Sequence, residues 1–221
     1  MSMKFLAEIN DNVETLVEGE GKDKKFYVQG LFLEFDSPNK NKRRYSSEMH
    51  DPEVKRYIKE KIEDNRAYGE LDHPDGPTIN LKNASHRIVK LTKEGKNWMG
   101  KAILMETPAG NIAKGILDSG GKLGVSSRGL GSLKATDEGY SDVGPDYKIL
   151  TAADIVSDPS AHGAFVAGIM ENCNWFYDES TGSYMAEKAD NLKKVLKTLP
   201  TREIMEKKAV IFENFLKLLS K

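Results

Sequence analysis

The pattern of apolar and polar residues predicts a strand and a hairpin in the first half of the chain. Residues 26–35 (FYVQGLFLEF) are rich in aromatic and branched side chains, which favours a strand interrupted at Gly30. Residues 87–91 and 98–105 are two further apolar runs, and the turn residues 94–96 lie between them. Two apolar runs on either side of a glycine-containing turn are typical of an antiparallel β-hairpin.

Shorter apolar runs predict more strands in the second half. They occupy residues 123–126, 133–135 and 147–156. We expect the last two to pair antiparallel, with residues 137–139 (DEG) in their connection. Strands therefore dominate the pattern up to about residue 170.

Two helices interrupt these strands. The first is expected to begin with Asp51 as its N-cap and Pro52 at the first helical position. Val54, Ile58 and Ile62 then follow at a spacing of four, which gives a narrow apolar stripe on a charged helix.

The second helix opens at Thr107 and Pro108 and ends at the stop signal formed by residues 119–121 (SGG). Ile112 and Ile116 share one face of it. We expect the first helix to be structural.

The pattern changes after residue 170. Residues 171–185 show little periodicity and contain a Ser-Thr-Gly-Ser cluster, so they are interpreted as a linker. Residues 186–221 have helical spacing and predict a tail of two amphipathic helices. The predicted organisation is an N-terminal peptide over 1–25, a main domain over 26–170, the linker and the tail. The fold class is α+β: a mostly antiparallel β core with inserted helices and a C-terminal helical tail.

Composition and charge narrow the function. The 221 residues include 33 basic and 34 acidic side chains, and a net charge of −1 gives no reason to expect nucleic acid or membrane as a partner. The basic run at residues 40–44 (KNKRR) is interpreted as a solvated loop. Cys173 is the single cysteine, so we expect a reducing compartment such as the cytoplasm. The sequence shows neither a secretory signal nor a membrane-spanning apolar run.

A histidine in a polar turn is the first candidate for chemistry. His73 lies in the segment GELDHPDG (residues 69–76), between carboxylates and directly before a proline. Because imidazole titrates near neutrality, it can accept a proton and return it, as acyl transfer requires. Taken alone, the segment is more typical of a surface turn, in which a histidine only makes hydrogen bonds. The four histidines show no HExxH or paired spacing, so neither a metal nor another cofactor is expected.

A glycine-flanked serine pair is the second candidate. Ser126 and Ser127 lie within GVSSRGLG (residues 124–131). A serine nucleophile needs an exposed Oγ at a sharp bend, with N–H groups nearby for the oxyanion, and flanking glycines permit such a bend. The alternative is an ordinary glycine-rich turn. The segment matches neither the G-x-S-x-G elbow nor a phosphate-binding loop.

Taken together, the two motifs resemble the prohead core proteases of tailed myophages, a family distantly similar to the herpesvirus assembly proteases. GELDHP followed about fifty residues later by GVSSRGLGSL carries the resemblance, which extends over residues 26–167. Supporting segments are Asn41-Lys42-Arg43-Arg44-Tyr45, Glu138-Gly139-Tyr140, Ala153-Asp154-Ile155-Val156 and Pro159-Ser160-Ala161. The resemblance implies a serine endopeptidase with a herpesvirus-protease-like barrel, in which Ser126 is the nucleophile and His73 the general base.

The third catalytic residue is expected to be Asp154. The resemblance places an acidic residue there, and a carboxylate inside the apolar run 149–156 needs a partner if it is buried. The herpesvirus relatives use a second histidine, so His162 and His86 are the alternatives.

The residues beside the serine have supporting roles in this scheme. Arg128 is expected either to organise the oxyanion site through its backbone N–H or a held water, or to pair with a carboxylate. Ser127 is expected to face away from Ser126, because side chains alternate along a strand.

The family resemblance also implies the substrates: scaffold or core proteins, the major capsid protein and the protease itself, inside the prohead in the host cytoplasm. It implies cleavage after glutamate in Leu-x-Glu or Ile-x-Glu contexts, and we therefore expect self-removal of the N-terminal peptide and of the C-terminal helices. Such triplets end at Glu8, Glu18, Glu106, Glu171, Glu206 and Glu213.

The tail helices either tether the zymogen to scaffold or to a second copy of the chain, or pack on their own domain. Two other functions stay open at this point: a non-catalytic capsid-assembly protein of the same fold, and a metal-dependent hydrolase built on His73 and nearby carboxylates.

Overall fold

The structure is a computed structural model that describes residues 3–10, 13–18, 25–72, 76–157, 175–178 and 183–186. The chain divides into two compact units, Met1–Met185 and Ala186–Lys221. The predicted tail helices lie outside the described residues. Where the linker was predicted, two short strands, β12 and β13, pair with each other. Their bounds are Trp175–Asp178 and Ser183–Ala186.

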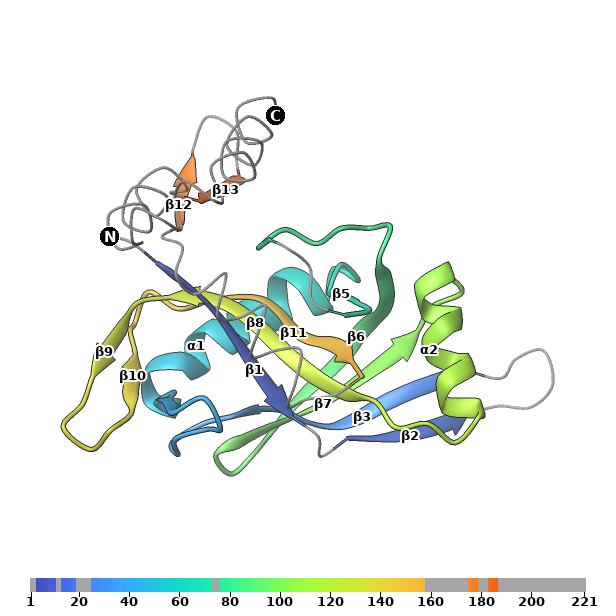
Figure 1. Ribbon diagram of the computed structural model, residues 1–221, viewed down its shortest axis with the longest axis horizontal. Coiled ribbons are helices and arrows are strands. Elements are labelled where there is room, and N and C mark those ends of the chain that lie inside the picture. The colour runs from blue at the N-terminus through green and yellow to red at the C-terminus, as the bar shows by residue number, and fades with distance from the viewer. Residues whose placement is uncertain are drawn as a thin grey trace, which may run out of the picture. The chain divides into compact units, whose positions relative to one another are not determined.

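The larger sheet has five antiparallel strands in the order β2-β3-β7-β6-β5 (Figure 1). It confirms the predicted strand and the predicted hairpin, whose turn contains Gly95 with a positive φ of 61°. Gly100 lies in β7, the central strand of this sheet, where Phe32 packs so closely that a Cβ added to Gly100 would come within 2.1 Å of the Phe32 ring. The strands are β2 Val13–Glu18, β3 Lys25–Glu34, β5 Tyr68–Glu70, β6 Ala84–Glu94 and β7 Asn97–Leu104.

The second sheet has three antiparallel strands in the order β1-β8-β11, so β8 is its central strand (Figure 1). All eight residues of β8 are buried. Because a central strand bonds to neighbours on both sides, it is held more firmly than an edge strand. The strands are β1 Lys4–Asn10, β8 Gly124–Gly131 and β11 Lys148–Val156.

The predicted pairing of residues 133–135 with 147–156 is wrong. Residues 133–135 form β9 (Leu133–Ala135), which makes a hairpin with β10 (Ser141–Val143). Residues 148–156 pair with β8 instead. The reason is local, because the turn around Gly139 (φ 82°) closes a short hairpin before β11 begins.

The basic run is only partly the solvated loop that we expected, because residues 40–42 are exposed whereas the two arginines are bound. β4 (Arg43–Arg44) pairs parallel with β10, and Arg43 is buried with its guanidinium on Glu8 of β1 (3.0 Å). Arg44 forms a two-point ion pair with Asp142 (2.7 and 3.0 Å). Carboxylates on two different strands therefore bind these two arginines.

The first helix begins earlier than predicted. α1 spans Ser47–Tyr57, and a π-helical turn, η2 (Ile58–Ile62), continues it. Asp51 is not its N-cap: the Asp51 carboxylate accepts a hydrogen bond from Trp98 Nε1 (3.0 Å), and Pro52 lies inside the helix. Burial of His50 and Tyr57 extends the apolar face, since they lie four residues before and three after buried Val54.

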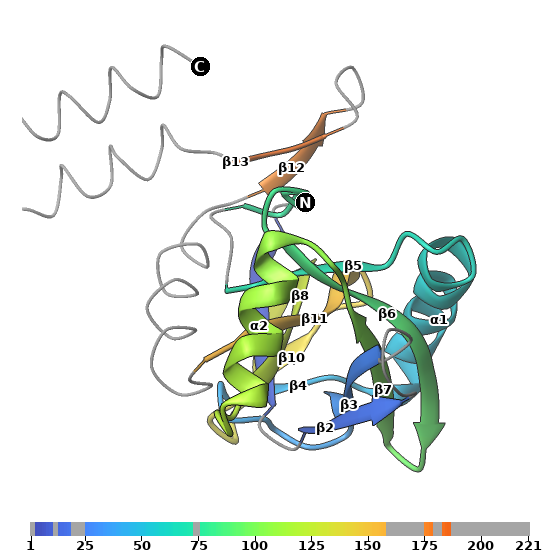
Figure 2. The same cartoon turned by 90° about the vertical axis from the view of Figure 1, so that its right-hand side faces the viewer.

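The second helix begins as predicted. α2 spans Pro108–Asp118, and its N-cap Thr107 accepts a hydrogen bond from the Gly110 N–H (3.1 Å). Its buried residues are Ala109, Gly110 and Ala113, whereas Ile112 is 56% exposed. Small side chains on this face let α2 approach β6 and β7 closely, and Figure 2 shows α1 and α2 on different sides of the strands.

The architecture is α+β with mostly antiparallel sheets and two α-helices, as the described residues show. The strands in this part of the chain form separate sheets and do not close into the predicted barrel. The two larger sheets meet where Leu71, just after β5, makes a parallel bridge with Ile155 of β11.

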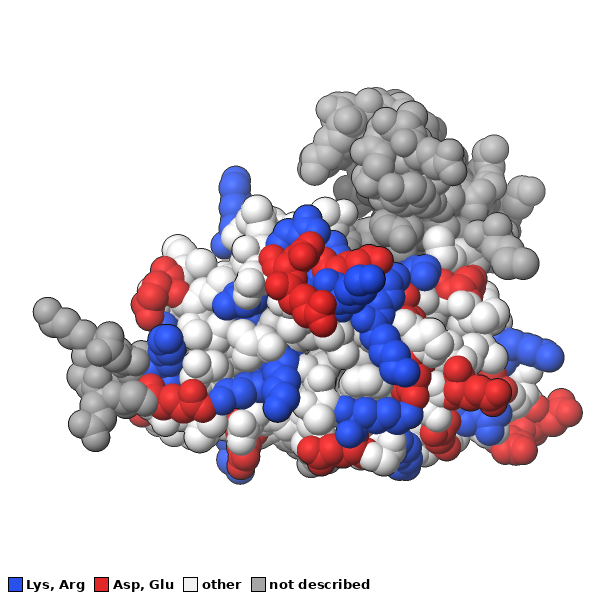
Figure 3. Space-filling model, turned by 180° about the vertical axis from the view of Figure 1, so that it is seen from behind, with Lys and Arg blue, Asp and Glu red and all other residues white. Residues whose placement is uncertain are grey.

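The surface and the N-terminal strands bear on the other expectations. Neither helix of the described residues is long and apolar enough to cross a membrane. Acidic and basic side chains are intermixed over the face in Figure 3, consistent with the near-zero net charge.

β1 and β2 fall inside the predicted N-terminal peptide 1–25. Removal of this peptide, which stays a prediction, would take a strand from each large sheet.

Candidate active site

Ser126 lies in the middle of β8 and not at the sharp, exposed bend that we expected. The flanking glycines pack against neighbours: at Gly129 an added Cβ would come within 2.3 Å of the Tyr147 ring. Ser126 is 0% exposed, and among the described residues its Oγ has no hydrogen-bond partner. A buried hydroxyl without a partner is uncommon in folded proteins and suggests a functional reason.

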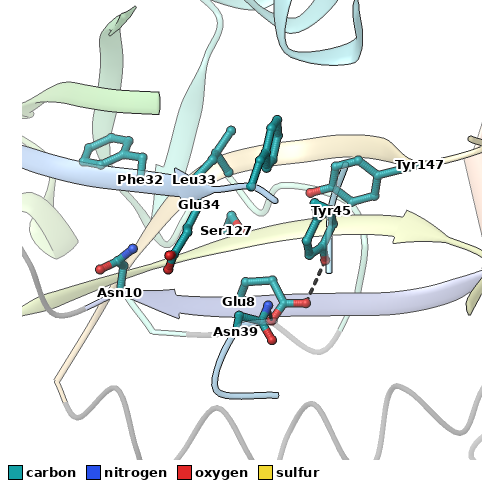
Figure 4. Close-up of a pocket in the computed structure, with 10 residues that line it drawn as sticks. Glu8, Asn10, Phe32, Leu33, Glu34, Asn39, Tyr45, Ser127 and Tyr147 are labelled. Atoms are coloured by element: carbon teal, nitrogen blue, oxygen red, sulfur yellow. Dashed lines mark hydrogen bonds between the residues drawn. The ribbon is translucent and has the colours of Figure 1, made fainter. Parts of the chain in front are cut away.

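Ser127 faces the opposite side of β8, as the alternation of a strand predicts. It lies across from Glu8 of β1 and lines a small cavity of about 30 Å³ together with Tyr45 and Tyr147 (Figure 4). Glu8 is held there by the Tyr45 hydroxyl (2.7 Å) and the Arg43 guanidinium (3.0 Å). The two serines therefore contact different surroundings, and only Ser126 shares a face with Arg128.

A bulge in β11 brings Asp154 to the face of β8 that carries Ser126. Thr151 lies opposite Arg128, but the next aligned pair is Asp154 with Ser126, so β11 contains one extra residue between them. In a regular strand, residues three apart point to opposite faces, and the extra residue cancels this reversal. Asp154 and Ser126 are direct cross-strand neighbours as a result.

Asp154 is fully buried and held from two elements. The Arg128 guanidinium donates to both of its oxygens, from Nε to Oδ2 and from Nη2 to Oδ1 (3.2 Å). The backbone N–H of Glu70 also donates to Oδ1 (2.8 Å). Burial raises the pKa of the Asp154 carboxyl, and Arg128 opposes part of that rise. Arg128 is thus the partner that a buried Asp154 needs, and of its two expected roles the structure shows the pairing with carboxylates.

Glu70 is a buried charge that sequence reasoning did not single out. It is 0% exposed, and its Oε1 accepts hydrogen bonds from Arg128 Nη2 (3.1 Å) and from the Asn80 N–H (2.9 Å). Desolvation raises the pKa of this carboxyl, and the Asn80 N–H and Arg128 oppose it. The signal that could have identified Glu70 is its place in a strand-like segment before Leu71. It belongs to the motif GELDHP, in which only the histidine was considered.

The chain on both sides of His73 is fixed to this cluster. The Asp72 N–H donates to the Ile155 carbonyl oxygen of β11 (2.8 Å). On the other side, the Gly76 carbonyl oxygen accepts from Arg128 Nη1 (2.9 Å). His73 itself lies outside the described residues, as do Pro74, Asp75 and the alternative third member His162.

His86, the other alternative, is buried in β6 with both ring nitrogens occupied. Its Nε2 lies 3.0 Å from the Ala153 carbonyl oxygen and its Nδ1 2.9 Å from Ser85 Oγ. Since a carbonyl oxygen only accepts, Nε2 carries the proton and Nδ1 accepts from the serine. An added Cβ at Gly69 would come within 2.3 Å of this ring, which explains why that position has no side chain. To act as the third catalytic residue, His86 would have to give up its hydrogen bond with either Ser85 or Ala153.

We expect His86 to make the protein sensitive to mild acid. Burial lowers the pKa of its ring to about 4, whereas an unfolded histidine titrates near 6.5. The unfolded chain therefore binds the proton first, and the stability from neutral His86 is complete above about pH 6.5 and is lost as the pH falls toward 4. Urea unfolding at pH 7, 6 and 5 should show a loss that steepens below pH 6.5 to about 1 kcal/mol per pH unit.

The control for this prediction is His86→Gln, in which the amide keeps a donor and an acceptor and cannot titrate. Its free energy of unfolding should fall less steeply between pH 6.5 and 4. Equal slopes for the two proteins would show that another group causes the acid sensitivity.

Comparison with known proteins identifies the family. A family model described as prohead core protein serine protease matches residues 6–174. The chain belongs to this family. The prohead core protein protease of Enterobacteria phage T4 is 34% identical over 198 residues, which cover 86% of this chain and 93% of the relative. The solved structure of the bacteriophage T4 capsid assembly protease has a TM-score of 0.66 and 30% identity, and the match covers 71% of this chain and 99% of that one.

Membership of the prohead core protease family confirms the resemblance read from GELDHP and GVSSRGLG. It establishes a protease of phage prohead maturation, with a mostly antiparallel α+β fold like that of the T4 capsid assembly protease. The catalytic assignments within this prohead protease stay predictions.

Proposed function

We propose that this prohead protease is a serine endopeptidase in which Ser126 is the nucleophile, His73 the general base and Asp154 the third member. The observation that supports this most is that Ser126, whose hydroxyl has no hydrogen-bond partner among the described residues, lies directly opposite Asp154 on the neighbouring strand. The segment leading to His73 is fastened to the residue after Asp154.

The chemistry follows from these roles. The Ser126 oxygen attacks the scissile carbonyl carbon while His73 takes the hydroxyl proton. His73 then gives that proton to the leaving amine, the acyl-enzyme forms, and water attacks the ester carbon with the same histidine as base. Asp154 stabilises the imidazolium that forms in each half of the cycle.

The described conformation is a latent one in this proposal. Because Ser126 has no exposed surface, a substrate carbonyl reaches it only after its surroundings rearrange. A protease made as an inactive precursor is expected to have such a conformation. Its substrates in this proposal are the scaffold or core proteins, the major capsid protein and the protease itself, within the prohead in the host cytoplasm, cut after Glu in Leu/Ile-x-Glu contexts.

Two of the triplets at which self-cleavage is proposed differ in their exposure. The triplet ending at Glu8 lies within β1, where Leu6 and Ala7 are 1% and 2% exposed. The triplet ending at Glu18 lies at the end of edge strand β2, and Val17 is 43% exposed. Since a protease binds its substrate as an extended, accessible chain, we expect the cut after Glu18 to come before the cut after Glu8.

Mass spectrometry during maturation with the scaffold and capsid proteins tests this proposal. Of the two N-terminal cuts, the one after Glu18 should appear before the one after Glu8, and Glu18→Gln should delay its appearance. A chain that stays intact while the other prohead proteins are cut would contradict self-cleavage. A first N-terminus after Glu8 would contradict the argument from burial.

The alternative function, a non-catalytic capsid-assembly protein, would leave unexplained why the Ser126 hydroxyl is buried without a hydrogen-bond partner among the described residues. The metal-dependent alternative is built on His73, which lies outside the described residues, and activity that a chelator leaves unchanged would exclude it.

A further inference from the structure

We propose that Glu70 is a positioning residue, whose carboxylate neutralises Arg128 so that Asp154 keeps a net negative charge beside Ser126. This rests on the proposed function, in which Asp154 stabilises the positive charge that forms on the general base. Glu70 would act through Asp154 and touch no substrate.

The geometry shows that one guanidinium is divided between two carboxylates. Arg128 binds Asp154 through Nε and Nη2, and the same Nη2 lies 3.1 Å from Glu70 Oε1. All three side chains are 0% exposed. Water cannot screen their charges, so the balance within the cluster matters more than it would on the surface.

The charge balance indicates what Glu70 adds. Arg128 and Asp154 alone form a neutral pair, whose opposite charges largely cancel at a neighbouring imidazolium. With Glu70 ionised, the cluster contains two negative charges and one positive charge. The net negative charge of the cluster then favours a cation next to Asp154, which is what general-base catalysis by a histidine requires.

Glu70 also makes hydrogen bonds that do not depend on its charge. Its backbone N–H donates to Asp154 Oδ1 (2.8 Å), and its side-chain Oε1 accepts from the Asn80 N–H (2.9 Å). A glutamine at this position keeps the backbone bond, the side-chain shape and an acceptor at Oε1. It adds donors only at the other oxygen, Oε2, which has no partner among the described residues. Glu70→Gln therefore removes the charge with little change in structure.

A purely structural ion pair is the competing explanation, and Glu53 offers a matched control. Glu53 on α1 is also a buried carboxylate, and it accepts from Arg56 (2.6 Å) and from the backbone N–H of Ile149 (2.7 Å). Like Glu70, it binds an arginine and a backbone N–H. The hydrogen bonds of the Glu53 carboxylate go to Arg56, Lys148 and the Ile149 N–H. None of them reaches Asp154 or the described residues on either side of His73.

The test compares Glu70→Gln and Glu53→Gln, each made as the full-length chain together with scaffold and capsid proteins so that it can mature, on a fluorogenic peptide that contains a Leu-Ala-Glu site. Rates are taken per folded molecule, and kcat and KM are measured from pH 5 to 9. We expect Glu70→Gln to lower kcat about tenfold or more with little change in KM. Glu53→Gln should reduce stability while its kcat per folded molecule stays at the wild-type value.

The pH profile separates positioning from structure. Among the described residues, the charged groups around Asp154 are Arg128 on β8, Glu70 on β5 and Asp72 just beyond β5. Removing a negative charge there lowers the pKa of the general base, so the acid limb of kcat/KM should move to lower pH in Glu70→Gln. Glu70→Asp restores the charge and should return the limb toward its wild-type position.

Two results would overturn the inference. One is a Glu70→Gln enzyme with wild-type kcat and an unmoved acid limb. If Glu70→Gln does not fold, Glu70→Asp decides, because an acid limb displaced to lower pH despite the retained charge would rule out the charge argument. Should Ser126→Ala still cleave, the proposed function itself would fail, whereas an inactive Ser126→Ala with a normal Glu70→Gln would refute only the role of Glu70.

Discussion

Replacing Ser126 with alanine is expected to lower the rate of prohead protein processing by about a thousandfold or more, which is the usual cost of losing a triad nucleophile. The same change should leave the stability of the protein equal or slightly higher. The Ser126 hydroxyl is buried without a hydrogen-bond partner among the described residues, and such a group costs free energy in the folded state. A methyl group at this position carries no such cost.

Ser127→Ala is the matched control for this experiment. It removes the same hydroxyl from the next residue of the same buried strand, but on the face that lines the cavity with Glu8 and Tyr147. Its processing rate should stay close to that of the wild type. Processing and thermal unfolding are measured for both variants after co-expression with scaffold and capsid proteins. If Ser126→Ala processes at the wild-type rate, or if Ser127→Ala is the inactive variant, the assignment of the nucleophile is wrong.

Replacing Arg128 with methionine is expected to cost about 3–5 kcal/mol of folding free energy, the range for breaking a fully buried ion pair. The loss is large because two carboxylates, Glu70 and Asp154, would stay buried without their shared cation. The substitution would also remove the hydrogen bond from Arg128 Nη1 to the Gly76 carbonyl oxygen, and this bond holds the chain just after the His73 segment. Urea unfolding at pH 7, fitted with a common slope, measures the change.

Arg44→Met provides the comparison. Arg44 pairs with Asp142 at two points, yet both side chains are more than a third exposed, so water replaces the lost contacts. The midpoint of unfolding should move far less for this variant. Similar midpoints for the two variants would mean that the buried cluster adds little to stability. Lowering the pH should partly rescue Arg128→Met, because protonation removes the uncompensated charge of the two carboxylates.

Local signals in the sequence gave reliable predictions. The strand at 26–35, the hairpin around Gly95 and the N-cap at Thr107 were found because residues close in sequence create them. Pairing between distant segments was harder to predict, and the strand at 148–156 was assigned to the wrong partner. The start of α1 was misplaced for a similar reason, since Asp51 bonds to Trp98, far along the chain.

The family, the two motifs and the choice of Ser126 and His73 came from the sequence by itself, because residue identities and their order along the chain are enough for those inferences. The tertiary structure alone decided the surroundings of Ser126. The bulge in β11 places Asp154 on the face of β8 that carries Ser126. Arg128 and Glu70 join Asp154 there in a cluster of charges that is buried from water. Those facts depend on cross-strand register and on exclusion of water, and both arise only when distant parts of the chain come together.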